Sequence, residues 1–347
     1  MQVWATRAGP PGVLEARDEQ AAPPSADADL ADRHVRIDVA YAGVNFADLA
    51  ARVGTYQSAP RFPFVPGFEV SGRVAASADP QLTPGTRVVA FTRFGGYSDA
   101  VTLPAEQVVA LPDAVSLQAA AALPVAYLTA YQGLVVMGSV RPESRVLVIG
   151  AGGGLGMAAV QVCRHLGATV LAAASSNKHQ HLIDSGVRHV IDYRDASLAT
   201  AVATITNDEG VDVVLEPRGA AACQESYAML APGGRLVICG NAAAVPAATP
   251  RPMAALLANL RFATTSFSAL RLARDNRAVM GIHLGELWHA VSRVRGWFDT
   301  LVRWTAEGSL APHIDKVFPL AQAADAHARL HARRNIGKVL LAPNPDR

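Results

Sequence analysis

The first third of the chain alternates apolar and polar residues over short distances. Residues 34–40 (HVRIDVA) place charged or polar side chains between apolar ones, which is the period of a half-buried strand. Further short strands are predicted at 70–75, 87–91 and 98–103, and prolines and glycines separate them. Short strands at this spacing predict a small β-barrel or sandwich.

The middle of the chain has a different pattern, in which apolar strands alternate with helical segments. The predicted strands are 145–149, 169–174, 189–193, 211–215 and 235–239. This alternation predicts a parallel sheet with right-handed crossovers, and therefore an α/β fold. The last third is mixed: helices are predicted at 287–307 and 322–333, an extended segment at 313–317, and a final strand at 338–341. Residues 21–31 are predicted to be a loop.

Composition limits the class of protein. A chain of 347 residues is long enough for two domains, and 50% hydrophobic with 17% charged residues rules out a disordered chain. A net charge of +2 and only 6% aromatic residues give no basis for nucleic-acid binding. The three cysteines (Cys163, Cys223, Cys239) are odd in number and lack metal-ligand spacing, so we expect inert thiols in a reducing compartment.

One uncharged segment has nearly the length of a membrane span. Residues 146–163 carry no charge, but five glycines lie between Gly150 and Gly156. We therefore expect a buried strand, a glycine turn and the start of a helix, and no transmembrane segment. No basic segment followed by an apolar run is present at residues 1–9, so we expect no signal peptide and a cytoplasmic protein, although peripheral membrane association stays open.

The glycine turn is typical of a dinucleotide site. Glycines in such turns permit the tight bend, the close approach of backbone to pyrophosphate, and the contact between helix and strand. The helix that follows presents unpaired N–H groups to the phosphates. The residues expected to bind the cofactor here are Ala151, Gly153, Gly154, Leu155 and Gly156. A glycine cluster alone is weak evidence, but the flanking strand, helix and second strand strengthen it.

The end of the second strand favours NADPH as the cofactor. NAD sites usually carry an acidic residue there, to bind the ribose 2′-hydroxyl. This chain instead has Ser175, Ser176 and Lys178, a hydroxyl pair and a cation that suit a 2′-phosphate. In the alternative interpretation, Lys178 is only a solvated charge at the start of a helix.

Several motifs resemble the quinone oxidoreductase branch of the medium-chain dehydrogenases/reductases. They are Gly43–Asp48, Arg52–Tyr56, Pro66–Glu69, Gly85–Val89, Ala120–Pro124 and Leu128–Tyr131. A narrower resemblance, to the vesicle amine transport protein group of that branch, covers nearly the whole chain. It is carried by residues 176–179, 186–193, 276–285, 312–315 and 335–341.

This resemblance implies two domains. They are a GroES-like β-barrel-type catalytic domain over 1–123, a Rossmann domain with a doubly wound parallel sheet over 124–268, and a return to the catalytic domain over 269–347. It also implies a homodimer, for which residues 263–268 are the candidate edge strand.

The resemblance also shows that ligands of the family's catalytic zinc are missing. Asn45 stands at the position of the family's cysteine ligand, and Gly67-Phe68-Glu69 replaces its Gly-His-Glu stretch. No cysteine lies between Phe91 and Val109, so the structural zinc lobe is missing too. We therefore expect no metal, and alcohol oxidation is a poor candidate because nothing would polarise the alcohol.

Hydride transfer to an electron-poor carbon remains possible without zinc. Quinones and α,β-unsaturated carbonyl compounds qualify, and the protein must then bind an oxyanion and supply a proton. Tyr56 is the first candidate for that proton; the alternative is a loop tyrosine that packs on Arg52 or Phe62. Asn45 can donate an amide N–H to a substrate oxygen or to the nicotinamide ribose; the alternative is an asparagine that stabilises a turn. Asp48 is expected to order its own loop.

The resemblance implies further cofactor contacts, namely Asn45, Thr129, Tyr193, Gly240, Asn241, Gly337 and Lys338. One departure lies after the strand 211–215, where the family has Asp-x-x-Gly and this chain has Glu216-Pro-Arg-Gly219. Arg218 is either a contact for an anionic substrate or a solvated loop charge. Substrate identity is therefore less secure than cofactor identity.

Three functions remain after these arguments. The favoured one is a zinc-independent, NADPH-dependent oxidoreductase that acts on a small electrophilic quinone or enone. The second is an enoyl reductase dedicated to a biosynthetic, polyketide-like or carrier-bound intermediate. The third is a non-catalytic NADPH-binding scaffold, which a damaged nicotinamide pocket would favour; Asn45, Tyr56 and Thr129 are all present.

Overall fold

The computed structural model describes residues 1–18, 34–193, 197–245, 248–287 and 290–343. The loop expected at 21–31 lies outside these ranges. The chain divides into two compact units: unit 1 comprises 1–128, 247–250 and 285–347, and unit 2 comprises 129–246 and 251–284. The structure thus places 124–128 with the first unit. It also places 269–284, which the sequence grouped with the returning segment, with the second unit.

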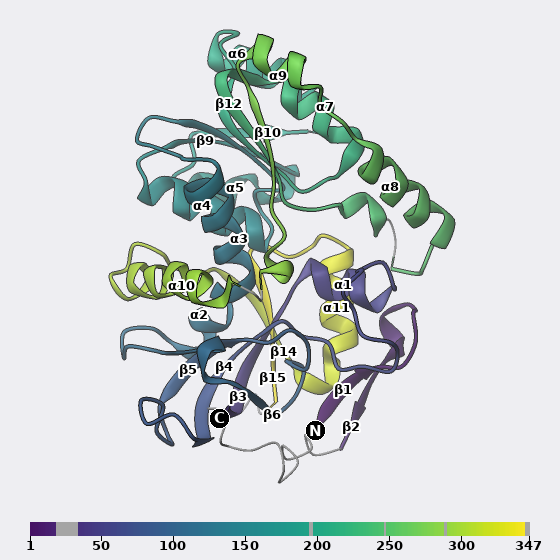
Figure 1. The fold of residues 1–347 in the computed structure, drawn as a ribbon, viewed down its shortest axis with the longest axis vertical. Helices are drawn as coiled ribbons and strands as arrows, with labels where there is room; N and C mark the ends of the chain where they lie inside the picture. Colours follow the sequence, from purple (N-terminus) through teal and green to yellow (C-terminus); the bar gives the residue numbers. More distant parts are fainter. Residues whose placement is uncertain (19–33, 194–196, 246–247, 288–289, 344–347) are drawn as a thin grey trace. The chain divides into compact units, whose positions relative to one another are not determined.

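Unit 1 is built on a seven-stranded sheet with the order β14-β15-β3-β4-β5-β7, and β6 pairs with β3 (Figure 1). Its strands are β1 (Gln2–Ala5), β2 (Leu14–Arg17), β3 (His34–Val44), β4 (Glu69–Ser77), β5 (Arg87–Phe91), β6 (Ala100–Pro104), β7 (Val108–Ala110), β14 (Ile314–Pro319) and β15 (Lys338–Ala342). Its helices are α1 (Phe46–Arg52), α2 (Leu117–Ala121), the wide-turned η4 (Leu123–Tyr127), α10 (Val291–Ala306) and α11 (Ala323–His331).

Three strands of this sheet bring distant parts of the chain together. The C-terminal strand β15 pairs antiparallel with β3, with Val339 opposite Val44. On its other side β3 pairs antiparallel with β4, with Ala42 opposite Val70. The residues at the adjoining strand ends (Asn45, Glu69 and Lys338) therefore lie at one end of the sheet, although up to 293 positions separate them in sequence.

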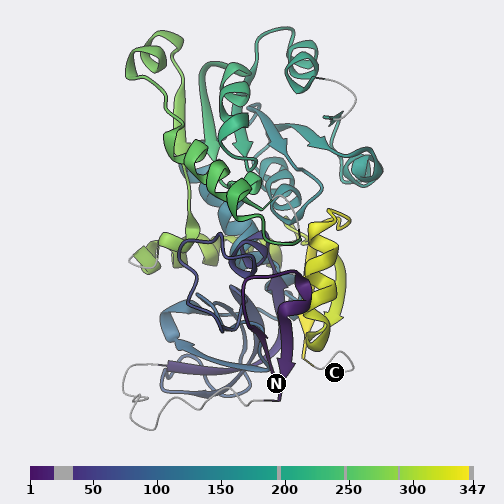
Figure 2. The same cartoon turned by 90° about the vertical axis from the view of Figure 1, so that its right-hand side faces the viewer.

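Unit 2 is built on a six-stranded parallel sheet with the order β10-β9-β8-β11-β12-β13 and with helices on both faces (Figures 1 and 2). Its strands are β8 (Arg145–Ile149), β9 (Thr169–Ala174), β10 (His189–Asp192), β11 (Val211–Glu216), β12 (Leu230–Ile238) and β13 (Ala278–Gly281). Its helices are η5 (Gln132–Met137), α4 (Gly154–His165), α5 (His179–Asp184), α6 (Leu198–Thr206), α7 (Ala220–Ala228), α8 (Pro252–Thr264) and α9 (Ala269–Asp275); α3 (Leu128–Tyr131) begins at its boundary. The α/β fold is therefore confirmed.

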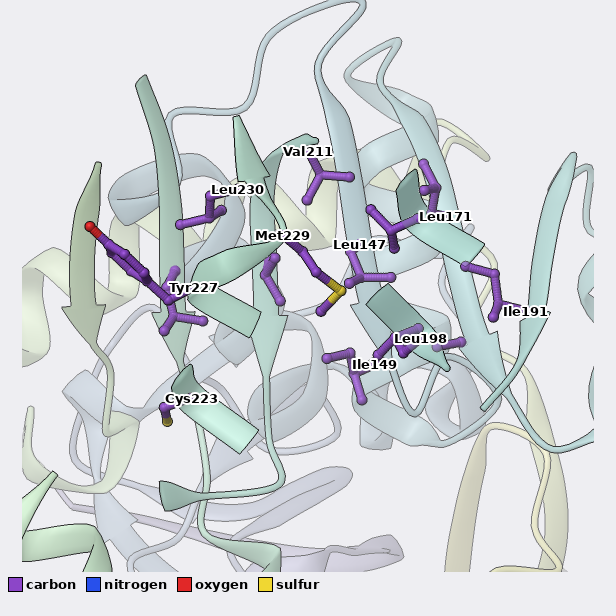
Figure 3. Packing of buried hydrophobic residues seen from close by; sticks show 14 residues of the cluster. Leu147, Ile149, Leu171, Ile191, Leu198, Val211, Cys223, Tyr227, Met229 and Leu230 are labelled. Atoms are coloured by element: carbon purple, nitrogen blue, oxygen red, sulfur yellow. The ribbon is translucent and has the colours of Figure 1, made fainter. Parts of the chain in front are cut away.

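The core of unit 2 explains why its strands are apolar throughout. Leu147 and Ile149 of β8 point to the face covered by α6 and α7, where they pack with Leu171, Leu198 and Tyr227 (Figure 3). The alternate residues of β8 are also fully buried, because they point to the opposite face, where α4 contacts β8 and β9. A sheet covered on both faces leaves no polar side in its central strands.

The edge of this sheet differs from the expectation. Residues 263–268 are not a strand, because Ala263 and Thr264 end α8 and the next four residues have no regular structure. The edge strand is β13, which pairs parallel with β12. Three of its four residues are apolar, but they are only half-buried, so the alternating pattern of a strand was weak there.

Candidate functional site

The glycine turn of unit 2 follows β8 as predicted. Gly150 adopts a φ of +75°, and a Cβ on Gly156 would lie 2.3 Å from the Gly150 carbonyl oxygen. Only glycine therefore fits where α4 crosses the turn. Gly153 caps α4 without a side-chain hydrogen bond, so the first N–H groups of the helix, at Gly154 and Leu155, have no partner within it. Such groups fit the phosphates of a dinucleotide.

Lys178 lies directly against this turn. A Cβ on Gly152 would meet the Lys178 side chain at 2.5 Å, and Lys178 is buried. Ser175 is buried next to it, and its hydroxyl donates to the Asn177 Oδ1 atom at 2.7 Å, while Ser176 is exposed. The structure thus brings Lys178 to the glycine turn with Ser175 beside it, donors that suit a phosphate monoester. Tyr193, 37% exposed, directly follows β10, which pairs with β9.

Two predicted residues follow β12 at the carboxyl edge of the parallel sheet. Gly240 and Asn241 lie beside the turn after β11, because Gly219 in that turn leaves room for the Asn241 side chain; a Cβ there would be 2.3 Å from Asn241 Oδ1. The Asn241 amide donates to Asn259 Oδ1 at 2.9 Å. Its own Oδ1 is buried and accepts no hydrogen bond from the described residues, so it remains available to a ligand. Thr129, on α3, is half-buried.

Arg218 is bound within the protein. The Glu216 carboxylate, which is fully buried, accepts bonds from the Arg218 Nε, Nη2 and backbone N–H, and it also accepts one from the Ser226 hydroxyl. Glu225 pairs with the remaining Arg218 nitrogen at 3.2 Å. The arginine is therefore the counter-charge of Glu216 and not the solvated loop charge considered as one alternative.

The predicted residues of unit 1 form a buried polar cluster. Asn45 Nδ2 donates to Glu69 Oε1 at 2.7 Å, and the Lys338 ammonium pairs with the same oxygen at 2.5 Å. Lys338 also donates to Asn45 Oδ1, and the second Glu69 oxygen accepts the Val125 N–H at 2.8 Å. All three side chains are buried. Gly337, with a φ of +72°, makes the turn into β15.

Asp48 orders the turn before α1, as expected. One carboxylate oxygen accepts the Asn45 N–H at 2.8 Å, and the other accepts the Gly67 N–H at 2.9 Å. Burial raises the pKa of Asp48 to about 7, against the lowering effects of these two hydrogen bonds and of Lys338. Asn45 completes a capping box with Asp48, so the turn-stabilising role considered for Asn45 is confirmed.

Tyr56 lies in an aromatic cluster. Its ring meets Phe68 and Phe94 edge-on, with centroids 5.4 Å and 6.4 Å apart. Burial, followed by the charges of Glu286 and Asp48, raises the pKa of Tyr56 to about 12. The hydroxyl is therefore protonated at neutral pH and can donate a hydrogen bond. Phe68, which the resemblance led us to expect in place of a histidine, is part of this cluster.

Sequence reasoning missed two features of unit 1. Glu69 was noted only within a motif, and its burial beside Gly43 was not foreseen: a Cβ on Gly43 would lie 2.0 Å from Glu69 Oε1. The second feature is a buried chain in which Arg52 Nε donates to His327 Nδ1 at 3.2 Å and His327 Nε2 bonds to the Tyr97 hydroxyl at 2.9 Å. Both features join segments far apart in sequence, so no local pattern signals them.

The amide, carboxylate and ammonium groups of the unit 1 cluster are unsuited to hold a transition metal. Within the ranges that the structure describes, no group of three or more His, Cys, Asp or Glu residues is placed to hold a metal ion. Cys163 and Cys223 are buried, and burial raises the pKa of both thiols, to about 11 for Cys223. They match the expected inert core thiols.

These two units, with a glycine-turn parallel sheet and a β-rich partner, define the medium-chain dehydrogenases/reductases, and the chain belongs to that family. Residues 31–113 match the alcohol dehydrogenase GroES-like domain, and residues 185–341 match the zinc-binding dehydrogenase family. The resemblance noted in the sequence is thus confirmed.

Individual proteins of known name or structure are similar to most of this chain. The chain is 39% identical over 308 residues to the human synaptic vesicle membrane protein VAT-1 homolog, covering 88% of this chain and 78% of that protein. It is 34% identical to quinone oxidoreductase-like protein 2 of Bos taurus, covering 89% and 84%. Among solved structures, Escherichia coli quinone oxidoreductase complexed with NADPH has a TM-score of 0.84 at 26% identity and covers 99% of both chains.

The helices of the described residues were also assessed as membrane spans. None of them is both long and apolar enough to cross a bilayer. The uncharged segment 146–163 forms β8, the glycine turn and most of α4, as the sequence predicted.

Proposed function

We propose that this protein is a zinc-independent, NADPH-dependent oxidoreductase that transfers hydride to a quinone or to an α,β-unsaturated carbonyl compound. The observation that carries this proposal is the cluster of Asn45, Glu69 and Lys338, in which an ammonium group is bound by a carboxylate and an amide. The family resemblance implies that zinc-dependent members have a cysteine ligand at the position of Asn45. With a lysine as the cation and Phe68 in place of a histidine, the site lacks a Lewis acid for alcohol oxidation.

The residues of unit 2 would hold the cofactor. The glycine turn would bind the pyrophosphate through backbone N–H groups, and Ser175 and Lys178 would bind the 2′-phosphate. The orphaned Asn241 Oδ1 would accept a hydrogen bond from the ligand. When bound, the nicotinamide supplies a hydride, the one chemical step that no side chain performs.

The residues of unit 1 would complete the reaction. Hydride addition to an enone or a quinone leaves negative charge on the substrate oxygen, which must be stabilised and protonated. Asn45 would donate its remaining amide N–H to that oxygen. Tyr56, kept protonated by its raised pKa, would donate a hydrogen bond or the proton itself.

The proposal is tested by titrating the purified protein with NADPH and, in parallel, with NADH, and then adding 9,10-phenanthrenequinone or a simple enone while absorbance at 340 nm is followed. We expect tighter binding of NADPH and its oxidation in the presence of one of the two acceptors. NADPH binding without turnover on either acceptor would contradict the proposed activity and favour a dedicated enoyl reductase or a scaffold. A full equivalent of tightly bound zinc, measured by elemental analysis, would contradict the zinc-independent mechanism.

We also propose a homodimer that pairs through unit 2. The strand β13 is the edge of the parallel sheet, so its outer N–H and C=O groups can pair with a second chain. Four large apolar side chains of α8 in the same unit (Met253, Leu256, Leu257, Leu260) are between 49% and 67% exposed. A monomer in light scattering would contradict the dimer.

A further inference from the structure

The hydrogen bonds of the unit 1 cluster determine which way the Asn45 amide points. A lysine ammonium can only donate, so the atom that faces Lys338 must be the oxygen Oδ1. The Glu69 carboxylate, paired with that lysine, accepts, so the atom that faces it must be the nitrogen Nδ2. Oδ1 also accepts the Asp48 backbone N–H in the capping box. The orientation of the amide thus follows from its neighbours.

One hydrogen of this amide remains unused. Nδ2 carries two hydrogens, and within the described part of the chain Glu69 Oε1 is the single acceptor that it contacts. Asn45 is buried, with 7% of its surface exposed, so the second hydrogen belongs to a donor whose direction is fixed. A fixed donor needs no reorganisation when charge develops on an oxygen in front of it.

We propose that Lys338 and Glu69 are positioning residues, which hold the Asn45 amide as a hydrogen-bond donor to the substrate oxygen that gains negative charge. The sequence instead placed Lys338 among the cofactor contacts. Its buried ammonium is already bound by Glu69 and Asn45, so it acts on the reaction through Asn45. The catalytic consequence of this inference rests on the proposed reductase function.

The surroundings of Glu69 make the arrangement rigid. Its second oxygen is bound by the Val125 N–H of η4, and the absence of a side chain at Gly43 leaves room for the first. Glu69 therefore has no alternative position within the cluster. A buried ion pair of this kind contributes little to stability by itself, because desolvation of both charges offsets their attraction. Its value lies in orienting a neighbour.

A double-mutant cycle on kcat tests this assignment. Asn45→Ala removes the donor and should lower kcat about 100-fold, the loss typical of one oxyanion donor. Lys338→Met should lower kcat about 30-fold, because the amide loses the ammonium bound to its oxygen and Glu69 loses its counter-charge, so that the donor is held less firmly. If Lys338 acts through Asn45, the double variant should be no slower than Asn45→Ala alone. If the losses of kcat from the two single substitutions instead multiplied in the double variant, the proposal would be overturned.

The Kd for NADPH, measured by fluorescence titration, distinguishes positioning from cofactor binding. The Kd should change less than about twofold in Lys338→Met, because the ammonium is bound inside unit 1. An increase of tenfold or more with kcat unchanged would instead assign Lys338 to the cofactor and overturn the inference. Lys316→Met on the neighbouring β14 is the matched control, since it removes an exposed lysine outside the cluster, and it should alter neither quantity.

A second variant addresses folding. Lys338→Met leaves the Glu69 charge buried without its partner, which is destabilising. Lys338→Met combined with Glu69→Gln removes both charges and should restore the melting temperature while kcat remains low. Recovery of kcat together with stability would show that the loss was only structural, and the proposal would be wrong.

An experiment without turnover separates this inference from the proposed function. In the wild-type protein, the side-chain amide of Asn45 should give a pair of slowly exchanging ¹⁵N–¹H NMR signals, and these should lose their protection in Lys338→Met but not in Lys316→Met. If the wild type reduces no acceptor and these signals behave as expected, the proposed reaction fails and the positioning stands. Fast exchange in the wild type would overturn the positioning itself.

Discussion

The glycine turn of unit 2 and the polar cluster of unit 1 are built in two different ways. The turn uses backbone groups from seven consecutive residues, and its geometry depends on side chains being absent at positions such as Gly156. The cluster uses side chains from three segments, at Asn45, Glu69 and Lys338, which meet only because β3 pairs with β4 and β15. The first can be recognised in a linear motif, whereas the second cannot.

This difference has a mechanistic meaning. A backbone turn recognises what all dinucleotides share, namely the phosphates, and it tolerates no added atoms. In the proposed function, the side-chain cluster determines which reaction a bound cofactor performs, because its chemistry depends on the identity of single residues such as Asn45 and Phe68. Four predictions test this division of roles, in order of decreasing expected effect.

Glycine substitutions in the turn should have the largest effect. In Gly156→Ala the new Cβ meets the backbone at 2.3 Å, so NADPH affinity should fall at least about 100-fold and stability by about 1–3 kcal/mol. In the matched variant Gly153→Ala the new Cβ would lie 3.4 Å from its nearest neighbour, the Gly150 carbonyl oxygen. The fold should therefore keep its stability, and only NADPH binding should weaken. Fluorescence titration and thermal melting measure the two quantities; equal affinities in all three proteins would show that the turn is not the cofactor site.

The same substitution in unit 1 should act on turnover. In Gly43→Ala the Cβ would lie 2.0 Å from Glu69 Oε1 and would displace this carboxylate from Asn45. We expect kcat to fall about 30-fold while the Kd for NADPH changes less than about twofold. Gly296→Ala on α10, where an added Cβ meets nothing within 4 Å, is the control. A loss of NADPH affinity as large as that of Gly156→Ala would contradict the division between the two regions.

The buried carboxyl group of Asp48 should make stability depend on pH. Its pKa in the folded protein, about 7, lies above the ordinary value of 3.8, so the folded protein binds more protons than the unfolded chain between these values. The stability from this group is complete below about pH 4 and is lost as pH rises through about 7. His327, whose pKa burial lowers, acts in the opposite direction, so wild type must be compared with Asp48→Asn.

Urea unfolding at pH 5, 6, 7 and 8 measures this effect. The free energy of unfolding of the wild type relative to Asp48→Asn should fall by about 1 kcal/mol per pH unit between pH 5 and 7 and then level off. A difference that stays constant over this range would mean that Asp48 keeps an ordinary pKa in the folded protein.

The smallest effect concerns the choice of cofactor. Lys178→Ala should raise the Kd for NADPH about tenfold and leave that for NADH within about twofold, because one charge-assisted contact to the 2′-phosphate is lost. Arg188→Ala, an exposed cation elsewhere in unit 2, should change neither. Parallel losses for both cofactors would indicate that Lys178 only supports the glycine turn, against which its side chain lies.

Much of the architecture followed from local patterns. The strands β5, β8 and β9 begin and end at the predicted residues, because continuous or alternating apolar runs bounded by turn residues are strong signals. The edge strand β13 was not predicted, and residues 263–268 were wrongly expected to form the edge strand. A half-buried edge strand has no clear alternation of apolar and polar residues. Likewise, Arg218 was considered as a contact for an anionic substrate. In the structure its guanidinium binds the carboxylate of Glu216, because the turn after β11 brings the two side chains together.

The sequence by itself determined the family, the α/β class and the position of the glycine turn, and it led us to expect that the zinc ligands are missing. Each of these depends on residues that are close together in the chain or on the identity of a single residue. Only the tertiary structure decided what surrounds Asn45. The reason is physical: the orientation of the Asn45 amide is set by a carboxylate 24 positions away and an ammonium 293 positions away, and strand pairing is what brings those charges together in a buried environment.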